Sequence, residues 1–226
     1  MTVSMHGDTT PERLPHRLDA REVRVLGALL EKEQATPDHY PLTVNALVQA
    51  CNQKSNRQPV MRLSEGEVRD ALERLFQHVL VWKSEGARAV RWRHAVDRRW
   101  QLTPPTKAVL TLLLLRGPQT VGELRGRSDR LHAFTSVSEV DDTLATLASG
   151  REPLVRQLPR GPGQKESRWV HLVGEDEEVA DTEGTAAAAP EAPGAPPEPD
   201  RLARLEQRVA DLEARLEELS QRFPSS

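Results

Sequence analysis

The sequence predicts an α+β protein, mainly helical, with two tandem winged-helix domains followed by a disordered acidic linker and a C-terminal coiled-coil helix. Three observations in the 226-residue chain lead to this prediction: a repeated order of helix and strand patterns, an acidic stretch rich in Ala and Pro, and a leucine heptad. The expected boundaries are a disordered leader at 1–16, winged-helix domains at 17–100 and 101–173, the linker at 174–200 and the coiled coil at 201–223.

The strongest evidence for the internal repeat is the start of the third helix of each unit. Ser64 with Glu67 in the first unit, and Ser136 with Glu139 in the second, each form a capping-box pattern followed by apolar residues at helical spacing. The start of the preceding helix at Thr43 recurs at Thr120. Repeated patterns in the same order indicate two copies of one structural unit.

Each third helix is followed by two short apolar segments that flank a polar, Gly-containing loop, at Ser84–Ala89 and Pro159–Ser167. This arrangement is typical of a β-hairpin. Three helices and a hairpin make a helix-turn-helix with an appended wing. The first copy is longer, and its extra residues fall between its helices at Glu31–Tyr40 and Asn52–Leu63.

The last two segments have simpler patterns. The linker has almost no branched or aromatic side chains, so it cannot bury enough surface to offset its ordering entropy. The heptad pairs Arg201 with Glu206 and Arg208 with Glu213 in a parallel dimer, which favours a parallel homodimer over an antiparallel one. Docking of the helix on its own domain is the alternative. The predicted oligomerisation residues are Leu202, Leu205, Val209, Leu212, Leu216 and Leu219.

Two stretches, Glu31–Leu72 and Leu113–Phe134, closely resemble the YceH-like family of uncharacterised bacterial proteins. The resemblance covers roughly Leu18–Val173, and its most specific string is TPDHYPL…ACNQKSNR…PV. It implies a tandem winged-helix fold, often with a C-terminal coil. It carries over no catalytic residue, because the family has none assigned.

The net charge of −3 conceals a strong segregation along the chain. Residues 17–174 contain 25 Lys and Arg against 18 Asp and Glu, a net charge of +7, whereas residues 175–200 contain nine acidic residues and no basic ones. A basic body favours a polyanionic partner such as nucleic acid. However, the third helices, which usually enter the major groove in this fold, are themselves acidic.

Positive charge is instead expected on the wings and loops, where it would contact phosphates with modest sequence specificity. The alternative is that these cations are solvated or pair with the acidic helices. The loop Cys51–Arg62 also has two interpretations: its polar side chains read base edges, or they cap helices and satisfy the backbone of the turn. The tryptophans near the wings are either core anchors or stacking platforms. The candidate contacts are Lys54, Arg57, Arg62, Lys83, Arg88, Arg91, Arg93, Arg98, Arg99, Arg125, Arg127, Arg130, Arg156, Arg160, Lys165 and Arg168.

Few residue patterns in the sequence are typical of an enzyme active site. Cys51 and His39, which follows Asp38, could be taken as a thiol–imidazole pair, but Cys51 ends an apolar helical face and fits a core position better. The histidines show no compact metal-ligand spacing, so no metal or other cofactor is expected. A single cysteine, the lack of an apolar run long enough to span a bilayer and the lack of a signal-peptide pattern predict a cytoplasmic protein without a membrane partner.

We therefore expect a non-enzymatic protein that associates with double-stranded DNA, as a transcriptional regulator or architectural factor, through basic wings and loops. The alternative is a winged-helix adaptor that grips an unidentified protein partner without touching nucleic acid, similar to subunits of bacterial chromosome-condensation complexes.

Overall fold

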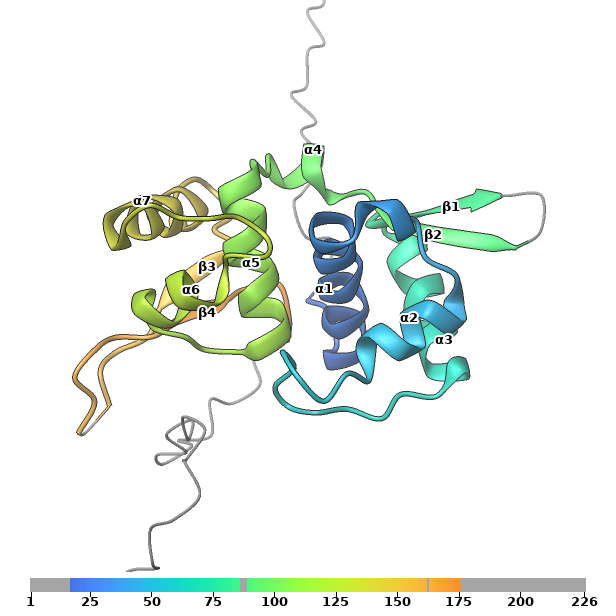
Figure 1. The fold of residues 1–226 in the computed structure, drawn as a ribbon, viewed down its shortest axis with the longest axis horizontal. Coiled ribbons are helices and arrows are strands. Elements are labelled where there is room, and N and C mark those ends of the chain that lie inside the picture. The colour runs from blue at the N-terminus through green and yellow to red at the C-terminus, as the bar shows by residue number, and fades with distance from the viewer. Residues whose placement is uncertain (1–16, 86–88, 162, 176–226) are drawn as a thin grey trace, which may run out of the picture. The chain divides into compact units, whose positions relative to one another are not determined.

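The computed structural model describes residues 17–85, 89–161 and 163–175, and within them the fold is α+β (Figure 1). The described residues belong to one compact unit. In chain order, its elements are α1 (Ala20–Ala35), a 3-10 turn (Pro37–His39), α2 (Val44–Cys51), α3 (Glu65–Gln77), β1 (Val81–Glu85), β2 (Val90–His94), α4 (Val96–Trp100), α5 (Pro104–Arg116), α6 (Val121–Arg127), α7 (Val137–Ala148), β3 (Val155–Gln157) and β4 (Trp169–His171).

The helix starts follow the local sequence. At α3 the Ser64 hydroxyl accepts from the Glu67 amide while the Glu67 carboxylate accepts from the Ser64 amide, so the predicted capping box is confirmed. At α7 only half of it forms. Ser136 caps the Glu139 amide, but the Glu139 carboxylate accepts from the backbone amide and hydroxyl of Thr135, at 2.8 and 2.9 Å. The threonine one residue earlier competes successfully for the same oxygen.

The internal repeat is visible in the backbone hydrogen bonds. Leu42 exchanges two of them with Trp92, at 3.0 and 2.7 Å, and in the second repeat Gln119 exchanges two with Trp169, at 3.0 and 2.7 Å. Each hairpin, β1–β2 and β3–β4, is therefore tied to the segment that precedes the second helix of its own repeat. The two strand pairs are antiparallel and form separate two-stranded sheets.

The two repeats share one core, because α1 packs against α5 (Figure 1). Residues 22–30 of α1 and 108–115 of α5 are buried around the whole circumference of each helix. The closest approach is at Gly27, where an added Cβ would lie 2.9 Å from Leu115 Cδ2 and 3.2 Å from Leu114 Cβ. A glycine at this position lets the two helices come together.

The first and last described segments close the unit. The Leu18 amide donates to the Val173 carbonyl at 3.0 Å, and the Glu175 amide donates to the Leu18 carbonyl at 2.8 Å. The buried Leu18 side chain adds an apolar anchor to these bonds.

Several predictions fall on residues outside the described part of the chain. They are the leader at 1–16, the linker from 176 onward, the heptad at 201–223 and the wing residue Arg88. Among the described helices, none is long and apolar enough to cross a membrane.

The end of α3 contains a strained residue. Val79, the second residue after α3, adopts a positive φ of 57° and is 48% exposed, and Gly150, the second residue after α7, has a φ of 92°. The Leu80 amide donates to the Leu75 carbonyl at 2.9 Å, which completes a Schellman-type C-cap. The left-handed conformation costs an L-residue about 1–2 kcal/mol, and a β-branched side chain is among the least suited to it.

We therefore expect Val79→Gly to raise the free energy of unfolding by about 1 kcal/mol, measured by urea denaturation. Gly150→Ala is the matched control, and it should lower the stability, because it introduces at the second site the strain that Val79 carries at the first. A destabilised Val79→Gly variant would contradict this account of the α3 C-cap.

Candidate functional site

The β1–β2 hairpin has one buried and one exposed face. Val81, Trp92 and His94 point inward and are buried, and Trp92 meets the ring of Phe76 edge-on, with centroids 6.2 Å apart. Since side chains alternate along a strand, the residues between them face outward.

The outward face of this hairpin carries an aromatic ring and two guanidinium groups. Trp82 is 45% exposed and lies directly opposite Arg93, which is also exposed. Arg91, opposite Ser84, donates to the Pro41 carbonyl at 2.9 Å, so its guanidinium is held against the turn before α2. We call Trp82, Arg91 and Arg93 the hairpin face.

The other predicted cations of the first hairpin region are tied to the protein. Lys83 pairs with Glu73 at 3.1 Å and lies 4.7 Å from the centre of the Phe76 ring. Arg99 donates to the His78 carbonyl at 2.7 Å, whereas Arg98 is exposed on α4. Of the described cations in this region, Arg91, Arg93 and Arg98 are exposed and make no ion pair with a described residue.

The Cys51–Arg62 loop is built around buried polar groups. Its base is closed by Asn52, whose side chain exchanges two hydrogen bonds with the Leu63 backbone at 2.7 and 2.8 Å. Arg24, 1% exposed, supports it from α1 by donating to the Cys51 and Pro59 carbonyls. These hydrogen bonds correspond to backbone capping, one of the two interpretations that the sequence allowed for this loop.

Arg57 has to be removed from the candidate contacts. Its side chain is fully buried, and it binds Glu31 through two bonds of 2.9 and 2.5 Å, with further bonds to the Ala50 carbonyl and Gln53. A buried guanidinium engaged in this way offers no surface to a ligand. The other two predicted contacts of this loop, Lys54 and Arg62, are both exposed.

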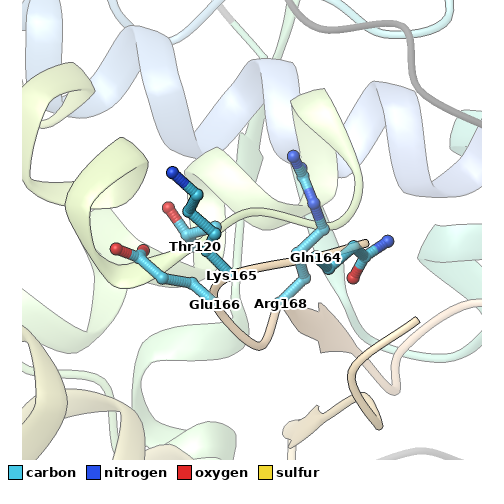
Figure 2. Close-up of a pocket in the computed structure, with 5 residues that line it drawn as sticks. All are labelled: Thr120, Gln164, Lys165, Glu166 and Arg168. Carbon is cyan, nitrogen blue, oxygen red and sulfur yellow. The ribbon is translucent and has the colours of Figure 1, made fainter. Parts of the chain in front are cut away.

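The second repeat gathers cations near the β3–β4 hairpin. A shallow hollow of about 230 Å³ is lined by Lys165 and Arg168 together with Thr120, Gln164 and Glu166 (Figure 2). Arg168 repeats the bond of its counterpart Arg91 by donating to the Pro118 carbonyl at 3.0 Å. Arg156 and Arg160 are exposed on the same hairpin.

The remaining predicted cations lie on and after α6. Arg127 donates to Gln119 Oε1 at 2.9 Å and to Glu123 at 3.3 Å, so it folds back over the start of its own helix. Arg125 reaches the Thr135 carbonyl at 3.4 Å, and Arg130 is exposed.

The exposed surfaces of α3 and α7 are acidic, as their sequences predict. On α3, Arg69 is neutralised by Glu65 at 2.6 Å, while Asp70 is exposed. On α7, Asp141 and Asp142 are exposed, and the helix has no basic residue. Neither helix is suited to approach phosphate groups, so a nucleic acid would have to be met by the hairpins and loops.

A polar cluster joins the two repeats. The Lys107 ammonium of α5 lies 2.7 Å from both the Glu33 and the Asp97 carboxylates, and His94 Nε2 lies 2.7 Å from Glu33. Glu33, His94 and Asp97 bring three potential metal ligands within 4.8 Å of one another. In this arrangement the lysine ammonium occupies the place that a cation would take.

This cluster predicts a pH dependence of stability. Burial alone would raise the pKa of Glu33, but hydrogen bonds and charge from His94 and Lys107 outweigh it and hold the pKa at about 2, below its ordinary 4.5. Because the pKa of Glu33 is lower in the folded protein than its ordinary value, the ionised carboxylate makes its full contribution to the free energy of unfolding above pH 4.5. This contribution is lost as the pH falls toward 2.

Glu33→Gln should therefore lower the free energy of unfolding at pH 7 by about 2 kcal/mol, the order of a hydrogen bond to a charged group. The variant and the wild type should converge between pH 4.5 and 2 in urea titrations. Glu65→Gln, which breaks an exposed pair, is the control and should change little. Parallel stability curves for Glu33→Gln and the wild type would refute the role given to Glu33.

Cys51 is a core residue, as predicted. It is fully buried, its thiol faces the Arg24 carbonyl at 4.0 Å, and burial raises its pKa to about 12. At neutral pH the thiolate required of a nucleophile is therefore not formed. His39, the proposed partner, is exposed on the 3-10 turn.

Comparison with known proteins places the chain in a family. The family model described as "Protein of unknown function, DUF480" matches residues 18–164, more than half of the chain. The chain belongs to the DUF480 family. The resemblance to uncharacterised bacterial proteins that the sequence motifs suggested is thereby confirmed at the family level.

The DUF480 chain is similar to several UPF0502 proteins. It is 48% identical to UPF0502 protein GSU0233 of Geobacter sulfurreducens over 192 residues, 84% of this chain and 88% of the relative. It is 46% identical to UPF0502 protein azo0627 of Azoarcus sp. over 221 residues, which cover 96% of both chains. A Shewanella amazonensis UPF0502 protein is 48% identical over 208 residues, 89% of this chain and 97% of the relative.

One basic residue of this DUF480 chain was missed by the sequence prediction. Arg116 ends α5, and its guanidinium donates to Asn56 in the Cys51–Arg62 loop of the other repeat. The sequence signal was weak, because a basic residue in the last helical turn is common and interacts favourably with the helix dipole.

Proposed function

We propose that this protein is a cytoplasmic, non-enzymatic, DNA-associated factor built from two tandem winged-helix units, a regulator or architectural protein that binds duplex DNA through its hairpins and loops. The order of elements supports the fold assignment. Each repeat has three helices followed by an antiparallel hairpin that is anchored to the segment before its second helix.

The observation that carries the proposal is the hairpin face. Arg91 and Arg93 make no ion pair within the described residues, and Arg93 lies directly opposite the half-exposed Trp82. Elsewhere on the first repeat, Arg69, Arg74 and Lys83 pair with carboxylates. Guanidinium groups that have no ion-pair partner can form charge-assisted hydrogen bonds with the phosphates of a nucleic-acid backbone.

The acidic helices determine the mode of binding. Because α3 and α7 repel phosphates, neither can insert into the major groove in the usual way, and contacts from hairpins carry little base information. Affinity should therefore depend strongly on salt and weakly on sequence.

The test is fluorescence anisotropy of a labelled duplex with the full chain over a series of KCl concentrations. The wild type should show a linear decrease of log K with log salt. Arg93→Ala should weaken binding several-fold at low salt and reduce the slope by about 1, as expected for one lost phosphate contact. Arg69→Ala, another exposed arginine of the same repeat, is the control and should bind nearly as the wild type does.

Arg91 is unsuitable for this test, because its bond to the Pro41 carbonyl also positions the hairpin. Failure of the wild type to bind duplex DNA at low salt would refute the proposal. Binding that Arg93→Ala leaves unchanged would refute the role of the hairpin face.

A second function is favoured by different surfaces. The acidic exposed faces of α3 and α7, with Val137 48% exposed at the start of α7, suit a protein partner better than DNA. As an adaptor, the protein would ignore DNA, and Val137→Asp together with Asp141→Lys would abolish retention of a defined protein from lysate. The same variants would leave duplex binding intact if the first proposal holds.

We also propose that residues 201–223 make the protein a parallel homodimer, on the strength of the heptad and its charge pairs. A chain truncated after residue 200 should elute as a monomer in size-exclusion chromatography with light scattering. A truncated chain of unchanged oligomeric state would rule out the heptad as the main contact.

A further inference from the structure

The turn between α5 and α6, residues 116–120, is surrounded by basic side chains from three directions. Arg116 ends α5, Arg127 returns from the end of α6 to Gln119, and Arg168 reaches the Pro118 carbonyl from the β3–β4 hairpin. Lys165 lines the hollow beside Thr120 and extends to the same side of the hairpin loop as Arg168 (Figure 2).

Arg116 is incompletely satisfied by the protein. Its guanidinium donates to the neutral Asn56 side chain, it makes no ion pair within the described residues, and its Nε is buried without a hydrogen-bond partner there. Burial, together with the charges of Arg127 and Arg57, lowers the pKa of Arg116 below its ordinary value. The negative charges of Glu31 and Glu123 oppose this lowering but do not cancel it.

Both carboxylates are engaged by other basic residues. Glu123 is shared between Arg127 at 3.3 Å and Arg168 at 3.2 Å, and it also caps the Thr120 amide. Glu31 is engaged on both oxygens by Arg57. Glu166 lines the same hollow as Lys165, and it makes no ion pair within the described residues.

The first repeat provides an internal comparison. When Thr43 is aligned with Thr120, the positions that correspond to Arg116, Glu123 and Arg127 are occupied by His39, Ala46 and Ala50. The positions of Lys165 and Arg168 correspond to Arg88 and Arg91, so both remain basic in the first repeat. Arg116 and Arg127 are therefore the two basic residues of the cluster that only the second repeat has, and they are not required to build the turn.

We propose that this turn binds a phosphate group, with Arg116 as its principal ligand and Arg127, Arg168 and Lys165 as supporting charge. A guanidinium presents parallel donors that match two phosphate oxygens, and an ammonium adds a point charge. The phosphate belongs either to a nucleic-acid backbone, in which case the inference rests on the proposed function, or to a free phosphate compound.

Pyrophosphate titrated into the full chain at low ionic strength is the direct test. In ¹H–¹⁵N spectra of the arginine side chains, the Arg116 Nε–H signal should shift in a saturable way. Arg116→Gln and Lys165→Gln should each weaken pyrophosphate binding at least threefold in calorimetry. Arg69→Gln, an exposed arginine on α3, should change it less than twofold.

Duplex DNA forms the second arm and separates the two sources. If Arg116→Gln lowers both pyrophosphate and duplex affinity, the site holds a backbone phosphate. If it lowers only pyrophosphate affinity, or if the wild type binds no duplex at all, the site holds a free phosphate compound, and in the latter case the proposed function alone fails. Pyrophosphate affinity that is unchanged in an Arg116→Gln variant with wild-type urea stability overturns the inference.

Discussion

Arg57→Met should lower the free energy of unfolding by about 3–5 kcal/mol, the usual cost of breaking a buried ion pair by removing one partner. The substitution leaves the Glu31 carboxylate, which is 12% exposed, without the two bonds that Arg57 now gives it. It also removes a donor from the Ala50 carbonyl. Urea denaturation at pH 7 and at a fixed protein concentration measures the loss.

A double variant separates the charge from the packing. Glu31→Leu combined with Arg57→Met should recover part of the loss, because it leaves no unpaired buried charge. Arg69→Met is the matched control, since its pair with Glu65 is exposed, and it should cost less than about 1 kcal/mol. A double variant as unstable as Arg57→Met alone would contradict the electrostatic explanation.

Gly27→Leu should lower the free energy of unfolding by about 3 kcal/mol, the upper range for overpacking a well-filled core. Leucine is intrinsically the better helix former by about 1 kcal/mol, so any loss must come from packing. An added Cβ would already lie 2.9 Å from the Leu115 side chain and 3.2 Å from Leu114 Cβ, and the rest of the side chain has to displace α5. Chemical denaturation again provides the measurement.

Gly126→Ala is the control for helix propensity. Nothing lies within 4 Å of a Cβ at Gly126, which is exposed on α6, so this substitution should raise the stability by up to about 1 kcal/mol. If Gly27→Leu were as stable as the wild type, the close approach of α1 and α5 would not be needed for the shared core.

Local features of the fold could be predicted from the sequence because they depend on a few neighbouring residues. The starts at Thr43, Ser64 and Thr120 form as expected, since each hydroxyl needs only an amide three residues later. The exception at α7 has the same local character. Thr135 stands one residue before the cap and takes the Glu139 carboxylate that the capping box required.

The candidate site was harder to predict, because charge alone does not determine exposure. Arg57 and Arg93 are equally basic in the sequence, yet one is buried against Glu31 and the other lies on the hairpin face. The tryptophans divide in a similar way. Trp92 and Trp100 are core residues, whereas Trp82 is half exposed. Trp82 and Trp92 both lie on the hairpin, and the alternation of side chains along its strands, together with the register of β1 and β2, determines which of the two is buried.

By itself, the sequence determined the three helices and the hairpin of each repeat and the segregation of charge along the chain, since these follow from periodicity, caps and composition. Only the tertiary structure decided that α1 and α5 meet at Gly27, that Arg57 lies inside, and that Arg116 lies beside a loop from the other repeat. Those outcomes depend on contacts between residues far apart in the chain, which no local pattern encodes.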